Sequence, residues 1–181
     1  MLLRLIRLFT LIVTFVCISS ATFAISLGEL QNSSQFWRER HDSSRDIYLD
    51  LNSVQNVIYE PPQYTLKFKV YAVDKKENFI AEGEAIADYD YNKSIEGIIK
   101  RNNLAKMPYN SEKVKSTVKK AKLKDSGIVN SLKVSAIYDF NGKEIYSGNP
   151  IKTAENIKVD ATSSGYIISV KAFKQYYKVT F

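Results

Sequence analysis

Few residues in this sequence are of the types that carry out nucleophilic, acid–base or metal chemistry. The 181-residue chain has one His and one Cys. The histidine, His41, is followed by Asp42, Ser43 and Ser44, which are the residue types of a hydrolytic triad. A triad is defined by the geometry of its side chains rather than by adjacency in sequence, and no serine here lies in a G-x-S-x-G turn. We therefore interpret His41 as a surface residue and predict no catalytic residue and no enzymatic activity.

Four acidic residues at close spacing raise the question of a metal site: Glu82, Glu84, Asp88 and Asp90. A Ca²⁺ loop needs six or more oxygen ligands and usually a glycine turn, and these residues instead alternate with apolar ones. The alternation indicates the solvent face of an amphipathic strand. The chain also has no P-loop, dinucleotide fingerprint or HExxH motif. We predict no metal ion and no cofactor.

The first 24 residues have the organisation of an export signal. Arg4 and Arg7 precede an apolar run over Leu8–Ile18, and small residues then permit cleavage after Ala24 or after Ala21. The apolar run is shorter than the roughly 20 residues that a membrane-spanning helix needs. The sequence therefore predicts an exported protein, periplasmic or at the cell surface, and not a cytoplasmic one. Its expected contact with the membrane is through the signal peptide only, before cleavage.

The mature chain is expected to fold as one domain without disulfides. Cys17 lies inside the signal, and its neighbours Phe15 and Val16 do not fit a lipidation site. The composition is that of a globular protein, with 45% hydrophobic and 25% charged residues. We divide the chain into a signal peptide (1–24), a mature N-terminal segment (25–36) and a single β-rich globular domain (37–181).

Positive charge is concentrated in the segment from Lys100 to Lys124, which has nine Lys or Arg residues against the single acidic residue Glu112. Asn110 or Ser111 can act as the N-cap of a helix over about 111–125, in which Val114, Val118 and Ala121 form an apolar stripe. We expect this stripe to lie on a sheet and the lysines to point outward. The lysines form either a solvated face or a basic ridge for acidic glycans, anionic lipids or an acidic protein.

The remainder of the chain has the alternation of β-strands. Tyr64–Val73 and Phe79–Tyr91 are expected to pair antiparallel, with Lys67 and Lys69 across from glutamates. Asn141-Gly142 between two alternating runs is a strong hairpin signal. The C-terminal run from Tyr166 to Phe181 is also predicted to be a strand, with a bend near Phe173. The predicted fold class is α+β: an antiparallel sheet or partly closed barrel of six to eight strands, with one basic amphipathic helix packed on it.

Tyrosine is abundant, with 12 residues, and its apolar ring with a polar tip is typical of contact surfaces. We expect exposed tyrosines among Tyr71, Tyr89, Tyr91, Tyr138, Tyr146, Tyr176 and Tyr177, with cross-strand packing as the alternative. The candidate binding surface consists of Lys113, Lys115, Lys119, Lys120, Lys122, Tyr89 and Tyr91.

Several short segments also occur in a familiar order: Trp37, a Tyr-x-Asp-x-x-Ser-Val run at Tyr48–Val54, Tyr89–Tyr91, Lys100-Arg101 and Tyr138–Ser147. From Trp37 to Gly148 the chain resembles the small exported surface-adhesin protein E-like domains of Gram-negative bacteria. The resemblance implies a compact domain with an antiparallel sheet and a helix. It also implies binding to host matrix or serum proteins.

The function expected from the sequence is that of an exported, non-enzymatic interaction module of the cell envelope. An adhesin is one kind of such a module. Its expected partner is a protein, an acidic glycan or another envelope component. Nucleic acid is excluded because the chain is exported and has no nucleic-acid-binding motif. One alternative is a small outer-membrane β-barrel, indicated by the aromatic C-terminus at Phe181. A hydrolase centred on His41 is the other.

Overall fold

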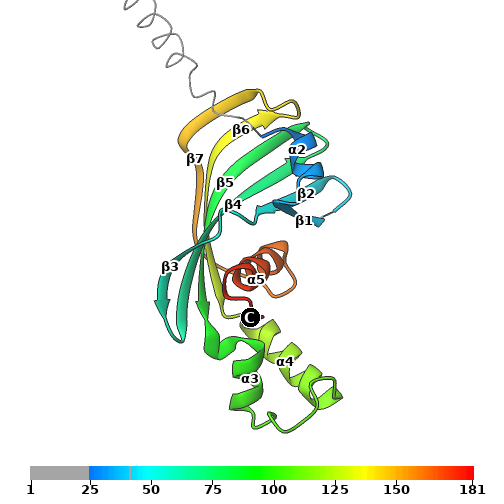
Figure 1. The fold of residues 1–181 in the computed structure, drawn as a ribbon, viewed down its shortest axis with the longest axis vertical. Coiled ribbons are helices and arrows are strands. Elements are labelled where there is room, and N and C mark those ends of the chain that lie inside the picture. The colour runs from blue at the N-terminus through cyan, green and yellow to red at the C-terminus, as the bar shows by residue number, and fades with distance from the viewer. Residues whose placement is uncertain (1–24, 41) are drawn as a thin grey trace, which may run out of the picture.

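The computed structural model describes residues 25–40 and 42–181, and it has the predicted α+β architecture (Figure 1). One open, antiparallel sheet of seven strands runs in the order β1-β2-β4-β5-β6-β7, and β3 adds to β4. The strands are β1 (Phe36–Arg40), β2 (Arg45–Asp50), β3 (Gln55–Glu60), β4 (Gln63–Asp74), β5 (Phe79–Asp90), β6 (Ile128–Asp139) and β7 (Glu144–Lys158). The predicted signal peptide and His41 lie outside the described residues.

The predicted β4–β5 hairpin is confirmed and forms the centre of the sheet. Its register is continuous from Gln63 opposite Asp90 to Asp74 opposite Phe79. The expected cross-strand ion pairs are present, because the Nζ atom of Lys67 lies 3.2 Å from Glu84 and that of Lys69 lies 3.0 Å from Glu82. The acidic row is therefore the polar face of an amphipathic strand, as its alternation indicates.

The two faces of the sheet bury different clusters. On one face, Leu66 and Phe68 of β4 and Ala85 and Ala87 of β5 pack under helix α5 (Ser164–Tyr177). Residues of opposite parity point to the other face, where the second cluster consists of Leu30, Tyr48, Tyr71, Val73, Ile80, Ala136 and Tyr138.

Leu30 belongs to helix α2 (Leu27–Asn32), whose first turn is closed by a capping box between Ser26 and Glu29. The segment 25–36, which we expected to precede the domain, therefore contributes a helix to the second cluster.

The C-terminal segment is a helix, and the predicted strand from Tyr166 to Phe181 is wrong. The Ser163 hydroxyl accepts a hydrogen bond from the Tyr166 N–H and caps α5. Ile168, Ala172 and Phe173 then share one buried face at helical spacing. The aromatic and β-branched residues of the segment favour a strand locally, but burial against the sheet outweighs that weak preference.

The Asn141-Gly142 turn joins β6 and β7 as predicted, and Gly142 adopts a left-handed φ of 85°. The return strand is longer than expected. The sequence indicates only two short strands here, at 143–148 and 156–161, whereas β7 is continuous over Glu144–Lys158. Its register against β6 shifts three times, and one of these shifts lies near Asn156, which has a φ of 54°. These bulges hide the period-2 pattern of the strand in the sequence.

Between β5 and β6 the chain leaves the sheet and forms a helical lobe (Figure 1). A 3-10 turn η1 (Tyr91–Lys93) leads into α3 (Ile95–Arg101) and then α4 (Glu112–Lys124). Ser111 caps α4 as predicted, through a hydrogen bond from the Val114 N–H. Helix α4 packs chiefly against α3, whereas α5 packs on the first cluster of the sheet.

Gly97 makes the η1–α3 junction possible. A Cβ atom at this position would lie 2.5 Å from the carbonyl oxygens of Tyr91 and Asn92. Gly97→Ala is expected to lower the free energy of unfolding by about 1–3 kcal/mol, because two backbone oxygens must move. Gly28→Ala in α2 is the matched control, since the nearest atom there is 4.0 Å away. Urea unfolding of both variants checks the prediction, and equal stability of the two would contradict it.

Candidate functional site

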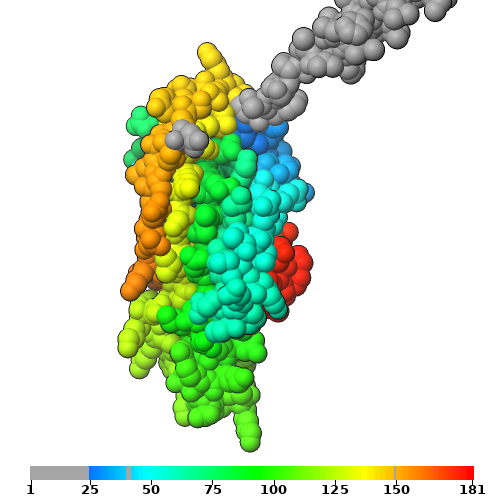
Figure 2. Space-filling model, turned by 90° about the vertical axis from the view of Figure 1, so that its left-hand side faces the viewer, coloured from blue at the N-terminus to red at the C-terminus, as the bar shows by residue number. Residues whose placement is uncertain are grey.

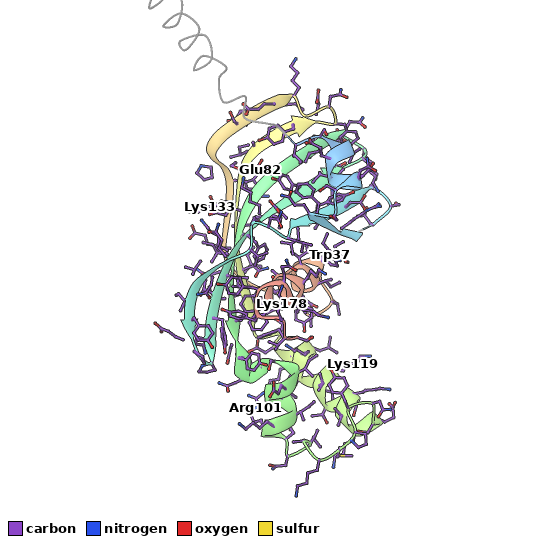
Figure 3. All side chains as sticks on the ribbon, viewed as in Figure 1. Trp37, Glu82, Arg101, Lys119, Lys133 and Lys178 are labelled. Atoms are coloured by element: carbon purple, nitrogen blue, oxygen red, sulfur yellow. The ribbon has the colours of Figure 1, made fainter. Side chains whose placement is uncertain are left out.

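The basic lobe, residues 95–124, carries the exposed lysines that the sequence analysis selected. Figure 3 shows Arg101 on α3 and Lys119 on α4. The side chains of Lys113, Lys115, Lys119 and Lys120 are all exposed. Of these four, only Lys115 has a carboxylate nearby among the described residues, Glu112 at 3.5 Å. The remaining charges are therefore free to act on an external anion.

Apolar side chains are exposed beside these lysines. Met107 and Tyr109 lie in the segment that connects α3 and α4, and Tyr109 is 61% exposed. Leu123, in the last turn of α4, is also exposed. The basic lobe thus combines unpaired positive charge with a few apolar contacts. Such a combination is typical of surfaces that lie at a membrane–water interface.

Lys122 differs from its neighbours because it is buried, with 6% of its surface exposed, and our expectation that it points outward is wrong. Its Nζ atom donates a hydrogen bond to the Ser126 carbonyl at 3.0 Å. The same atom lies 4.1 Å from the centre of the Phe181 ring and 5.4 Å from that of Tyr166. Burial lowers the pKa of Lys122 to about 8, and the nearby Asp125 only partly opposes this effect.

The tyrosines divide between core and surface. Tyr89, proposed for the binding surface, is buried in the core at 1% exposure, and its hydroxyl donates to the Ser169 carbonyl at 2.9 Å. It is therefore not available to a surface partner. Tyr91 is half-buried, with its hydroxyl 2.9 Å from Glu96. Tyr71 and Tyr138 are buried, whereas Tyr146 and Tyr176 are exposed.

The tyrosines that pack inside the protein show raised pKa values. Burial raises the pKa of Tyr138 to about 12, and Glu82 beside its hydroxyl adds to the effect. Burial also raises the pKa of Tyr177 to about 12. The hydroxyl of Tyr177 is held by Asn56 of β3 at 2.6 Å. Cross-strand and helix–sheet packing thus accounts for most of the tyrosine content.

An apolar hollow lies between α5 and the sheet face that α5 covers, and no pattern in the sequence predicts it. Its volume is about 440 Å³. The lining comes from β2, β4, β5, β6, β7 and α5, and includes Ile47, Val70, Ala72, Leu132, Ile157 and Ile168. Strand parity in the sequence places several of these residues on one face, but the curvature that makes the face concave has no local signal.

The opposite side of the sheet is different in character. Figure 2 shows strands lying side by side across this side, with the basic lobe below them, and α2 packs at one end of it through Leu30. Glu82 and Lys133 belong to it, together with the lysines that pair with the acidic row. Because these charges are largely paired with one another, this surface is less suited to an external anion than the basic lobe.

The fold and these surfaces define an α+β protein in which an open antiparallel sheet packs on α5 and α2 and extends into a basic helical lobe. Comparison of the chain with models of known protein families, with curated proteins and with solved structures finds no match. No helix among the described residues is long and apolar enough to cross a membrane.

Proposed function

We propose that the protein is an exported, non-enzymatic binding module of the cell envelope, and that its basic lobe binds an anionic surface. The observation that carries the proposal is the set of exposed, unpaired lysines on a lobe that extends from the sheet. Between residues 95 and 124, nine basic residues oppose two acidic ones. A field of one sign attracts an extended anion more strongly than any single pair would.

The exposed apolar residues favour lipid headgroups over an acidic glycan as the anion. Met107 and Tyr109 are placed beside Lys106 in the α3–α4 connection. At a bilayer surface a tyrosine ring sits at the headgroup level while lysines contact anionic lipids. A more specific version of the same proposal is an adhesin-like role, in which the basic lobe contacts a host surface.

Charge reversal of the lobe tests this function. We expect Lys113→Glu, Lys119→Glu and Lys120→Glu together to lower the affinity for anionic vesicles at least about 100-fold, since each lysine near such a surface contributes about 1 kcal/mol. Binding of the native protein should also weaken as salt rises, because exposed charges are screened over about 10 Å at 0.1 M. Co-sedimentation with phosphatidylglycerol vesicles measures both effects.

The matched control reverses three exposed lysines away from the lobe: Lys76, Lys143 and Lys152. It changes the net charge by the same amount and is expected to bind nearly as the native protein does. Equal loss in both triple variants would show that net charge alone matters and would overturn the assignment to the lobe. Retention on heparin without binding to vesicles would assign the lobe to glycans instead.

A further inference from the structure

The hollow under α5 has the size and lining of a ligand site. Its volume of about 440 Å³ falls within the range of small-molecule pockets, roughly 300–1,000 Å³. It lies on the face of the sheet that packs against α5 (Figure 1). Ile157 of β7 lines it and remains 50% exposed, which is a high value for an isoleucine on the buried face of a sheet.

The polar groups around the hollow already have partners within the protein. The side chain of Asn130 exchanges hydrogen bonds with Ser169 at 3.0 and 3.2 Å. The Ser131 hydroxyl accepts from the Asn156 N–H, and the Ser163 hydroxyl is occupied as the cap of α5. Asp160 accepts hydrogen bonds from Thr162. A ligand in the hollow therefore meets apolar surface, so its bound part must itself be apolar.

The lining favours a flexible aliphatic chain. Ala72 and Ala85 leave shallow space between the larger side chains of Val70, Leu132 and Ile157. A space between small and branched aliphatic groups suits a chain of methylenes, each of which gains favourable burial. Lys158 follows Ile157 on β7, so its side chain points to the opposite face of the strand, where its charge acts on Asp125. The hollow therefore contacts the aliphatic chain, and a polar head group remains in water.

We propose that this hollow binds the aliphatic chain of an amphiphile, whose head group remains in water. The same chemistry is offered by a free fatty acid and by the acyl chain of an anionic phospholipid. The inference goes beyond the proposed function, because it concerns a different surface and a single bound molecule rather than docking on an extended one.

The test is a fluorescence titration of the mature protein with cis-parinaric acid, a polyene fatty acid. Saturable binding of one molecule per chain is expected. Ile157→Glu should weaken it at least tenfold, because a carboxylate would then face the bound chain. Ile145→Glu is the matched control, since Ile145 lies on the same strand at 61% exposure and does not line the hollow. Equal affinity of the two variants, or no saturable binding by the native protein, would overturn the proposal.

A second variant fills the space rather than charging it. Ala72 is exposed, so Ala72→Trp should fold, which its circular dichroism spectrum verifies, and should exclude the probe from the hollow. Unaltered binding by this folded variant would place the probe elsewhere and would also overturn the proposal. Displacement by palmitate and by hexadecanol alike is expected, because only the aliphatic chain enters the hollow. Displacement by palmitate but not by hexadecanol would show that binding needs a charged head group and would overturn this assignment.

Two further measurements distinguish the sources of the ligand and test this proposal separately from the proposed function. Displacement of the probe by free palmitate alone assigns the site to fatty acids, whereas displacement by phosphatidylglycerol vesicles as well assigns it to lipid acyl chains. The triple variant of the basic lobe should bind cis-parinaric acid as the native protein does. Vesicle docking retained by this variant, with probe binding also retained, would therefore reject the proposed function and leave the hollow intact.

Discussion

Phe173→Ala is expected to lower the free energy of unfolding by about 3–5 kcal/mol, the range found when a buried phenylalanine is truncated. Phe173 is fully buried at the centre of the α5–sheet interface. Its ring centre lies 4.7 Å from that of Tyr177, 4.9 Å from that of Tyr89 and 5.3 Å from that of Phe181. Removing the ring leaves a cavity bordered by aromatic groups that cannot easily collapse.

Urea unfolding measured by circular dichroism checks this effect against Tyr176→Ala. Tyr176 is an aromatic residue on the same helix but is 45% exposed, and its main ring contact is Tyr177 at 5.0 Å. We expect the control to lose less than about 1 kcal/mol, in line with surface substitutions and a single aromatic pair. A Phe173→Ala variant as stable as the control would mean that α5 does not anchor the core.

Lys122→Met is expected to raise the free energy of unfolding at pH 7 by about 2 kcal/mol. In the folded protein the ammonium group is buried against Phe181, and its pKa falls from 10.5 to about 8. Each unit of pKa shift corresponds to about 1.4 kcal/mol, so keeping Lys122 protonated at pH 7 opposes folding. Methionine has a similar shape and no charge. Part of the gain is offset because the Ser126 carbonyl loses its donor.

The pH dependence of the native protein supplies an independent check of the same residue. Between pH 8 and 10.5 the unfolded state binds the Lys122 proton more fully than the folded state does, so stability rises with pH across this window. Above about pH 10 the raised pKa values of buried tyrosines such as Tyr138 act in the opposite direction. Urea unfolding from pH 7 to 9.5 should show a rise in the native protein and a flatter profile in Lys122→Met.

Two outcomes would contradict this account of Lys122. A methionine variant that is less stable than the native protein at pH 7 would show that the hydrogen bond and ring contacts outweigh the burial of charge. Identical pH profiles would show that Lys122 remains hydrated when folded. Lys120→Met is the matched control, since Lys120 is exposed on the same helix and should change stability by less than about 0.5 kcal/mol.

Features of the fold that depend on neighbouring residues could be predicted from the amino-acid sequence alone. The alternation in 64–73 and 79–91 predicted the central hairpin together with its ion pairs, because side chains two residues apart share a face. Asn141-Gly142 predicted the second hairpin, and Ser111 predicted the start of α4. The exposure of most lysines on α4 also followed from its narrow apolar stripe.

Features that depend on partners far apart in the chain follow from the folded arrangement and not from local sequence. Residues 166–177 have mixed local preferences, and they are helical because Phe173 and its neighbours pack on the sheet. Lys122 is buried because the last turn of α4 meets Phe181, 59 positions further along the chain. The apolar hollow exists because strands separated by more than 80 residues curve around one helix. Local propensity is weak compared with such packing, so these features cannot be predicted from a short window of the sequence.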